Sequence, residues 1–271
     1  MQYVELQGEK IPAIGLGTWQ LTENCVESVK NALNMGYEHV DTAQVYGNEA
    51  EVGEGIEQSD VDREDIWLTT KVWRDNLNKE DLKKSVEESL EKLQTDYVDL
   101  LLIHWPFEEM NLEEVLKEMD ELVEEGKARY IGVSNFTSEQ IREAQELSEN
   151  QLLTDQVEYH PFLNQDEVLS ESREQDMMLT AYSPIARGDV IGNEALKEIG
   201  DKYGKSEVQV ALRWLIQQEK VCAIPKATSE EHQEANLEIF DFELSENEIE
   251  EISNLGREDR KVDPDFGPEW D

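Results

Sequence analysis

The sequence has 271 residues, a length that suits one large α/β domain, and its 64 acidic against 24 basic residues give a formal net charge of -40. A surface of this sign repels nucleic acid and anionic lipid, which excludes both as expected partners. No stretch approaches the ~20 consecutive apolar residues that cross a bilayer, and the first residues lack the basic and apolar regions of a secretory signal, so we expect a soluble, cytoplasmic protein.

Acidic residues are spread over the exteriors of the expected helices, as at Glu87, Glu88 and Glu91, and do not form one tail. In molar salt the Debye length falls to about 3 Å, so repulsion among such charges is screened. We interpret the excess as the surface of a halophilic protein from a high-salt cytosol. The two cysteines, Cys25 and Cys222, are expected to be buried packing residues, and no histidine spacing indicates a metal site.

The chain opens with two short strand-like segments, 3–6 and 11–14, which turn residues around Gly8 join into an expected β-hairpin. Short apolar segments then alternate with amphipathic stretches of helical periodicity. The strand-like segments cover residues 15–18, 39–42, 66–72, 97–104, 130–134, 155–158, 179–182 and 221–224. The helices expected at 25–35, 81–93 and 141–147 have as their capping candidates Thr22, Asn78, and Thr137 or Ser138, respectively.

Eight such β-then-α units predict a (β/α)8 TIM barrel, formed as one domain by residues 1–271. The spacing also allows an open doubly wound sheet. Against that alternative, the turn at Gly15-Leu-Gly17 lacks the third glycine of a dinucleotide-binding fingerprint. Residues 256–271, which include Pro264 and Pro268, are expected to form a C-terminal tail that lies over the barrel.

Polar residues stand where the expected strands end. The second, third and fourth strands of the barrel end near Asp41, Lys71 and His104, and Tyr46 lies in the loop after the second strand. The carboxyl ends of barrel strands meet at one mouth, where active sites are found. A carboxylate and an ammonium are tolerated there only if they pair. We therefore expect these four side chains to converge.

The motifs around these residues resemble those of a known family, the aldo-keto reductases. The segments Asp41-Thr-Ala-Gln-Val-Tyr46-Gly-Asn-Glu49, Thr70-Lys71-Val-Trp and Leu102-Ile-His104-Trp-Pro match its three catalytic motifs, and the resemblance runs from about Glu5 to Leu255. Further matches are Ile11-Pro-x-Ile-Gly-Leu-Gly-Thr18-Trp, Ile131-Gly-Val-Ser-Asn-Phe136, Gln156-Val-Glu-Tyr-His-Pro161, Ala181-Tyr-Ser-Pro184 and Ile224-Pro-Lys226. The brief C-terminal tail is most similar to the short microbial members, such as the diketogluconate reductases.

The resemblance implies a catalytic tetrad of Asp41, Tyr46, Lys71 and His104 and a reaction between NAD(P)H and the carbonyl group of an aldehyde, ketone or keto-sugar. Tyr46 would be the general acid. A free phenol titrates near 10, and we expect the ammonium of Lys71 to lower the pKa of Tyr46 toward the working pH. Asp41 would hold Lys71, and a neutral His104 would donate a hydrogen bond to the carbonyl oxygen.

The resemblance also assigns residues to the cofactor and the substrate. Those implied to contact the cofactor are Thr18, Ser134, Asn135, Gln156, Tyr182, Ser183, Ile185, Arg187, Lys226, Thr228, His232 and Asn236. Those implied to form the substrate pocket are Trp19, Trp73 and Trp105. Lys226 is kept, whereas Ala227 and His232 stand where NADP-binding relatives have serine and arginine. We expect NADPH as the cofactor, with NADH or dual use left open.

Two alternatives are kept. Lys71 could act as the nucleophile of a Schiff-base barrel lyase, since Tyr46 and a carboxylate would suit that chemistry. The chain could also be a non-catalytic, cofactor-binding regulatory subunit. A small-molecule carbonyl compound is the expected partner and a monomer the expected state. The loops that select the substrate are the least readable part of the sequence.

Overall fold

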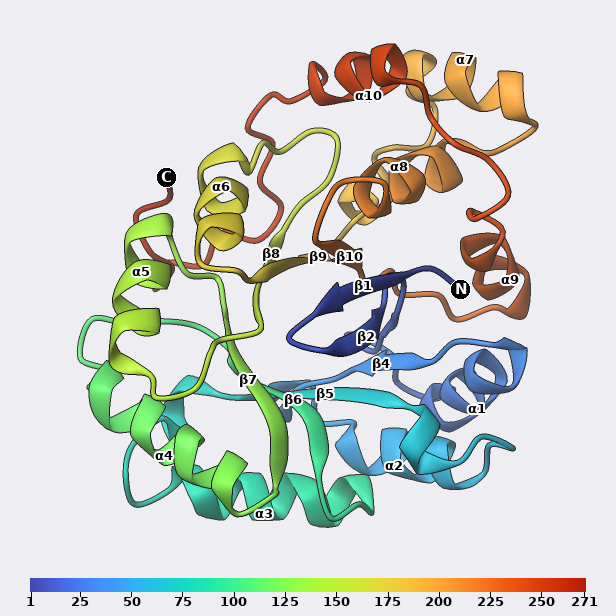
Figure 1. The fold of residues 1–271 in the computed structure, drawn as a ribbon. Coiled ribbons are helices and arrows are strands. Elements are labelled where there is room, and N and C mark those ends of the chain that lie inside the picture. Colours follow the sequence, from blue (N-terminus) through green and yellow to red (C-terminus); the bar gives the residue numbers. More distant parts are fainter.

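The computed structural model describes all residues 1–271, and Figure 1 shows a ring of strands surrounded by helices. Eight strands form one parallel sheet in which each strand pairs with its sequence neighbours, from β3 to β10. They are β3 (Leu16–Gly17), β4 (His39–Asp41), β5 (Trp67–Val72), β6 (Val98–Ile103), β7 (Ala128–Ser134), β8 (Thr154–Glu158), β9 (Met178–Tyr182) and β10 (Val221–Ala223).

The first and last strands of the sheet meet, and their contact closes the barrel. Gly15 N–H donates to the carbonyl of Ala223 at 2.9 Å, Ala223 N–H donates to that of Ala13 at 3.0 Å, and Gly17 N–H donates to that of Pro225 at 3.1 Å. A methyl group on Gly17 would lie 2.6 Å from the carbonyl oxygen of Ile224, so only glycine allows this approach. The expected TIM barrel is confirmed.

Helices cover the outside of the barrel (Figure 1). They are α1 (Cys25–Met35), α2 (Glu49–Glu57), α3 (Leu82–Leu93), α4 (Leu112–Glu124), α5 (Ser138–Leu147), α6 (Asp166–Glu174), α7 (Glu194–Tyr203), α8 (Glu207–Ile216), α9 (Glu230–Leu237) and α10 (Glu246–Ser253). None of them combines the length and apolar character that a membrane span requires.

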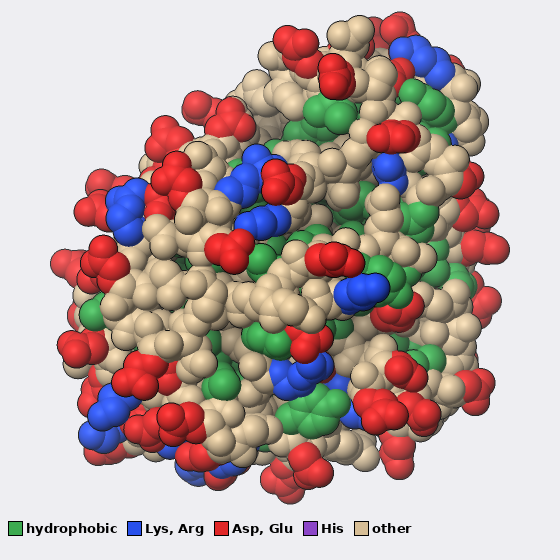
Figure 2. Space-filling view, viewed as in Figure 1, with side chains coloured by type: hydrophobic (Ala, Val, Ile, Leu, Met, Phe, Trp, Pro, Cys, Tyr) green, Lys and Arg blue, Asp and Glu red, His purple; other side chains and the backbone are tan.

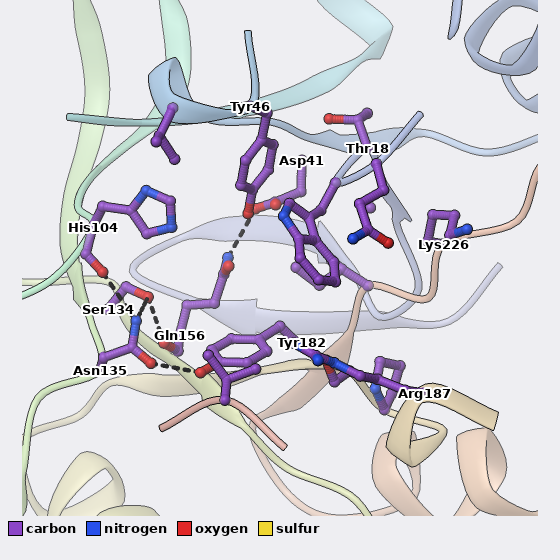
Figure 3. Close-up of a pocket in the computed structure, with 18 of the residues that line it drawn as sticks. Thr18, Asp41, Tyr46, His104, Ser134, Asn135, Gln156, Tyr182, Arg187 and Lys226 are labelled. Atoms are coloured by element: carbon purple, nitrogen blue, oxygen red, sulfur yellow. Dashed lines mark hydrogen bonds between the residues drawn. The ribbon is translucent and has the colours of Figure 1, made fainter. Parts of the chain in front are cut away.

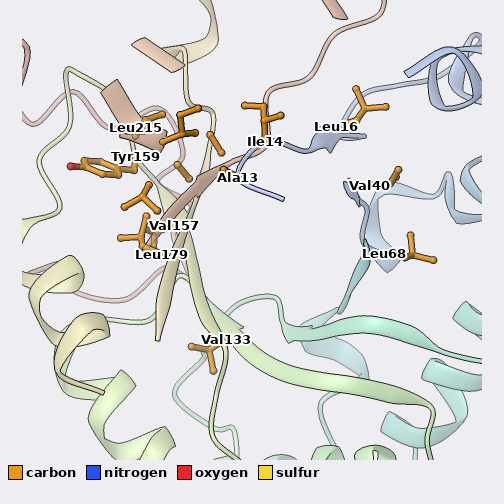
Figure 4. Close-up of a cluster of buried hydrophobic side chains, with 14 of the residues drawn as sticks. Ala13, Ile14, Leu16, Val40, Leu68, Val133, Val157, Tyr159, Leu179 and Leu215 are labelled. Atoms are coloured by element: carbon orange, nitrogen blue, oxygen red, sulfur yellow. The ribbon is translucent and has the colours of Figure 1, made fainter. Parts of the chain in front are cut away.

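Successive side chains of each strand point alternately to the outside and the inside of the barrel, which divides the core into two parts. On β6, Leu101 and Ile103 belong to the large cluster between the strands and the helices, part of which is drawn in Figure 4. Leu100 and Leu102, one position out of phase, belong to a smaller cluster inside the barrel. The interior is thus filled by side chains and forms no pore.

An N-terminal hairpin, β1 (Tyr3–Leu6) and β2 (Glu9–Pro12), closes one end of the barrel. Figure 1 shows it lying across the ring of strands. Its apolar residues Val4, Leu6 and Ile11 join the interior cluster. The hairpin was expected, although its second strand begins before the predicted residue 11. The end that stays open to ligands is therefore the opposite one, at the carboxyl ends of the strands.

Two capping predictions are wrong. The residue that caps α1 is Asn24 rather than Thr22, and α3 is capped by Asp81, neither with a side-chain cap hydrogen bond. Asn78 instead accepts from the backbone of Glu80 and Asp81 in the turn before α3. At α5 the prediction is confirmed, because Thr137 forms a capping box with Gln140.

The C-terminal tail lies against the open end of the barrel. The backbone N–H groups of Arg257 and Asp259 donate to the carbonyl of Phe162. Those of Lys261 and Val262 donate to the buried carboxylate of Glu158 at the end of β8, each at 2.7 Å. The predicted tail thus packs against the barrel through a specific anchor.

Candidate active site

A cavity of about 610 Å³ opens at the carboxyl ends of the strands (Figure 3), which is the expected place for an active site in this fold. Its size lies in the range of small-molecule and cofactor sites. Most of the predicted site residues line it: Thr18, Trp19, Asp41, Tyr46, Trp73, His104, Trp105, Ser134, Asn135, Gln156, Tyr182, Ser183, Ile185, Arg187 and Lys226. Lys71, Thr228, His232 and Asn236 do not.

Lys71 lies behind the cavity wall, with its side chain entirely buried. Each of its N–H groups has an acceptor. They point to Asp41 Oδ1 at 2.5 Å, to the carbonyl of Thr42 at 2.8 Å and to Tyr46 Oη at 3.4 Å. Parallel pairing of β4 with β5 aligns Asp41 with Thr69, so the two charged side chains extend from neighbouring strand ends. Their pairing compensates two charges that would otherwise be costly to bury.

Tyr46 ends the short 3-10 turn Gln44–Tyr46 after β4, and its ring faces the cavity beside His104. The two rings meet edge to face with centroids 5.7 Å apart, and Trp73 contacts His104 from another side at 5.3 Å. Burial, helped by the charge of Lys71, holds the pKa of His104 well below 6.5. The imidazole is therefore neutral near pH 7, as expected from the sequence.

The expectation of a lowered pKa for Tyr46 is wrong. Burial raises the pKa of the Tyr46 phenol well above 10, and the negative charge of Asp41 raises it further. Lys71 Nζ lies 3.4 Å from Tyr46 Oη but only 2.5 Å from Asp41 Oδ1. Tyr46 is thus a protonated phenol at neutral pH, with its proton available to an acceptor in the cavity.

Three residues from the ends of β7 and β8 form a second polar wall (Figure 3). Ser134 donates to the carbonyl of Gln156, and Asn135 donates to the carbonyl of His104 at 3.0 Å. Asn135 accepts from the hydroxyl of Tyr182 at 2.8 Å, and its backbone has a positive φ of 64°. These hydrogen bonds hold a row of amide and hydroxyl groups across the cavity from Tyr46.

Gln156 connects this wall to the ion pair. Its Nε2 donates to Asp41 Oδ2 at 2.8 Å, whereas Lys71 occupies Oδ1. The carboxylate is therefore held from both sides of the barrel, by β5 and by β8.

The loop after β9 carries the next group of predicted contacts. Ser183, Ala186 and Arg187 all have positive φ values, which non-glycine residues rarely adopt. The guanidinium of Arg187 lies over the ring of Trp19 at 4.9 Å. Among the residues that line the cavity, Arg187 and the exposed Lys226 are the two cations.

The remaining predicted contacts lie outside the cavity. Thr228 and His232 are exposed around the start of α9, whereas Asn236 is buried on that helix. The hydroxyl of Thr18, by contrast, is buried on the cavity wall without a hydrogen-bond partner. A polar group left unpaired at such a place is suited to a ligand.

Sequence reasoning missed several residues that shape the site. Val262, from the tail, lines the cavity. Phe266 packs edge to face against both Trp73 and Trp105, so the tail supports these pocket residues from behind. The proline-containing tail carried no motif that could have shown these contacts.

The comparisons with known proteins agree with this geometry. The model of the Aldo/keto reductase family matches residues 13–257. The chain belongs to the aldo-keto reductase family. It is 40% identical to methylglyoxal reductase DkgB of Escherichia coli O157:H7 over 266 residues, 96% of this chain and 99% of that one. It is also 40% identical to glyoxal reductase of Bacillus subtilis strain 168, over 93% and 92% of the two chains.

A solved structure gives the same result. A crystal structure assigned as a 2,5-diketo-D-gluconic acid reductase B has a TM-score of 0.98 and 45% identity, covering 100% of this chain and 98% of that one. The protein is therefore an oxidoreductase that uses a nicotinamide cofactor to reduce small carbonyl compounds. The residues present fit such a cofactor, since the cavity offers an unpaired hydroxyl, an amide wall, an aromatic ring at Tyr182 and two cations.

The Schiff-base alternative does not fit this reductase. A Schiff base requires the amine to reach a carbonyl carbon. Lys71 does not line the cavity, and all of its N–H groups already have acceptors within the protein.

Proposed function

We propose that this reductase converts small α-dicarbonyl compounds and related aldehydes to alcohols with NADPH, using Tyr46 as the general acid. The observation that carries the proposal is the phenol of Tyr46 beside His104 on the cavity wall, with Lys71 hydrogen-bonded behind it. The relatives named as methylglyoxal and glyoxal reductases support a compact dicarbonyl substrate.

The chain's own residues would perform the proton chemistry. The nicotinamide cofactor, when bound, supplies a hydride to the carbonyl carbon. Negative charge then grows on the carbonyl oxygen, and Tyr46 Oη delivers its proton there to give the alcohol. The phenolate left on Tyr46 is stabilised by Lys71 Nζ at 3.4 Å and regains a proton from solvent. His104 would orient the carbonyl oxygen through a hydrogen bond.

The preference for NADPH rests on Lys226, which would meet the 2′-phosphate that NADH lacks. Arg187 would meet the pyrophosphate that both cofactors carry, and a protein with a net charge of -40 needs local positive charge to hold an anion. The preference is tested by titrating the protein with NADPH and with NADH and measuring each Kd from the quenching of protein fluorescence. Tighter binding of NADH would contradict it.

The role of Tyr46 is tested by Tyr46→Phe, which keeps the ring and removes the proton. We expect kcat for reduction to fall by about 10³-fold, the size of a general-acid contribution, while the Kd for NADPH changes little. Tyr203→Phe is the matched control, because it removes a phenol bonded to Glu248 on the outside of the barrel and should keep full activity. Unchanged turnover in Tyr46→Phe would remove Tyr46 from the mechanism.

We also propose that the protein works in a high-salt cytosol. Figure 2 shows acidic side chains scattered over the face viewed, with far fewer basic ones among them. Repulsion within this surface destabilises the fold at low ionic strength and is screened in molar salt. Activity and melting temperature should therefore rise together as KCl increases toward about 2 M, where screening is nearly complete. Full activity in dilute buffer would contradict the proposal.

A further inference from the structure

Gln44 begins the turn that carries Tyr46, but its side chain points away from the main cavity. The residue is half-buried and does not line the cavity, whereas its neighbours Val45 and Tyr46 do. Its amide instead lies between the loop after β5 and helix α3. Gln44 therefore contacts neither substrate nor cofactor directly.

The amide of Gln44 uses its full hydrogen-bonding capacity of two donors and two acceptor positions. Nε2 donates to the hydroxyls of Ser85 at 3.1 Å and Ser89 at 3.2 Å, both on α3. Oε1 accepts from the backbone N–H of Trp73 at 2.9 Å and from Asn76 Nδ2 at 3.0 Å. One side chain thus joins three segments that are far apart in the sequence.

These contacts link the two aromatic residues that flank His104. Tyr46 lies two positions after Gln44, and Trp73 is held by Gln44 through its backbone. The Tyr46 and Trp73 rings lie 5.7 and 5.3 Å from the His104 ring. The spacing between the proposed proton donor and this wall of the substrate pocket therefore depends on the amide of Gln44.

We propose that Gln44 is a positioning residue that sets substrate selectivity by fixing Trp73 relative to Tyr46. The amide matches both sides, since the hydroxyls of Ser85 and Ser89 accept from it and the β5 loop donates N–H groups to it. An apolar side chain of similar size would leave the N–H of Trp73 without its acceptor and release the indole. The pocket would then discriminate less strongly against bulky carbonyl compounds, whereas Tyr46, Lys71 and Asp41 would keep their contacts.

The test compares propanal with the bulky 2-naphthaldehyde in wild type, Gln44→Met and Gln44→Glu. In Gln44→Met the ratio of kcat/KM for propanal to kcat/KM for 2-naphthaldehyde should fall about tenfold, mainly through the KM values. A shift of the Trp73 wall by a fraction of an ångström has effects of this order. Glutamate keeps the acceptor for Trp73, and the hydroxyls of Ser85 and Ser89 can turn from their backbone acceptors to donate to it. Gln44→Glu should therefore stay within about threefold of the wild-type ratio.

Gln58→Met is the matched control, since Gln58 is an exposed glutamine bonded only to Glu54 on its own helix turn. It should leave the ratio unchanged. If Gln44 has only a structural role, Gln44→Met will lower the melting temperature without changing the ratio, and this result overturns the proposal. If Gln44→Met does not fold, the double variant Ser85→Ala/Ser89→Ala replaces it, because this variant removes both acceptors of the Gln44 amide on α3. The double variant should lower the ratio as well. An unchanged ratio in the double variant also overturns the proposal.

The inference rests on the proposed role of Tyr46, but the two can fail separately. Failure of that role appears as full turnover in Tyr46→Phe. Failure of the present proposal appears as an unchanged substrate ratio in folded Gln44 variants, with Tyr46→Phe still inactive.

Discussion

The carboxylate of Asp41 lies 2.5 Å from the ammonium of Lys71, and both side chains are almost entirely buried. The pair joins the ends of β4 and β5 and supports Tyr46 from behind. Its effect on stability can be separated from its effect on catalysis, because each partner can be replaced alone or together with the other.

Asp41→Asn and Lys71→Met should each lower the free energy of unfolding by about 3–5 kcal/mol, since each leaves a buried charge without its partner. The double variant should lose much less free energy of unfolding than the sum of the two single losses. Urea unfolding of the wild type, the two single variants and the double variant completes the cycle. The exposed pair Lys84 and Glu88, 3.7 Å apart on α3, gives the matched cycle, in which coupling should be near zero. Additive losses at Asp41 and Lys71 would contradict the prediction.

The pH dependence of reduction should show a broad plateau. Tyr46 must be protonated to act as the acid, and because its pKa is raised well above 10, this requirement fails only in strong alkali. His104 must be neutral, and because its pKa lies well below 6.5, protonation disables it only in acid. Single-turnover rates should therefore stay constant between about pH 6 and pH 9. A limb with its midpoint near the ordinary histidine value of about 6.5 would contradict the assignment.

Buried His39 should make the protein less stable in mild acid. Burial lowers the pKa of His39 from 6.5 to about 4, so the unfolded chain binds a proton that the folded chain refuses. Stability is full above the unfolded value and falls as pH drops from about 6.5 toward 4, by about 2 kcal/mol between pH 7 and pH 5. In His39→Asn this component should disappear from urea unfolding measured at both pH values. His232→Asn, at an exposed position, should keep the wild-type difference.

Glu158 should determine whether the C-terminal tail stays in place. Its buried carboxylate accepts from Lys261 N–H, Val262 N–H and His160 Nε2. In Glu158→Gln one accepting oxygen becomes an NH₂ group, so the amides of residues 261 and 262 should exchange about tenfold faster with deuterium. Glu167→Gln, at an exposed position of α6, is the control. Unchanged exchange in Glu158→Gln would show that other contacts hold the tail.

The barrel and most of the cavity could be predicted from the sequence because their signals are local. A strand such as β6 shows its apolar run within a few residues, and parallel strands bring their polar ends together by topology. Asp41, Lys71 and His104 therefore converge as expected. The capping residues of α1 and α3 were harder, since several neighbouring polar residues offer nearly equivalent turns.

The features that could not be predicted depend on contacts between residues far apart in the sequence, which no local pattern encodes. The pKa of Tyr46 depends on the balance between burial, Asp41 and Lys71, which are separated in sequence and meet only in the fold. The partners of Gln44 lie up to 45 residues away, and its motif gives no sign of them. The same holds for Glu158, whose partners lie 103 and 104 residues downstream.

The burial of Lys71 also bears on the durability of the catalyst. Reactive carbonyl compounds condense with free amines, so an enzyme that binds them risks covalent damage to any lysine they can touch. Here the amine behind Tyr46 is walled off from the substrate cavity and saturated with acceptors. The amine proposed to support proton transfer is thus kept from the molecules being reduced, and we expect it to stay unmodified on repeated exposure to them.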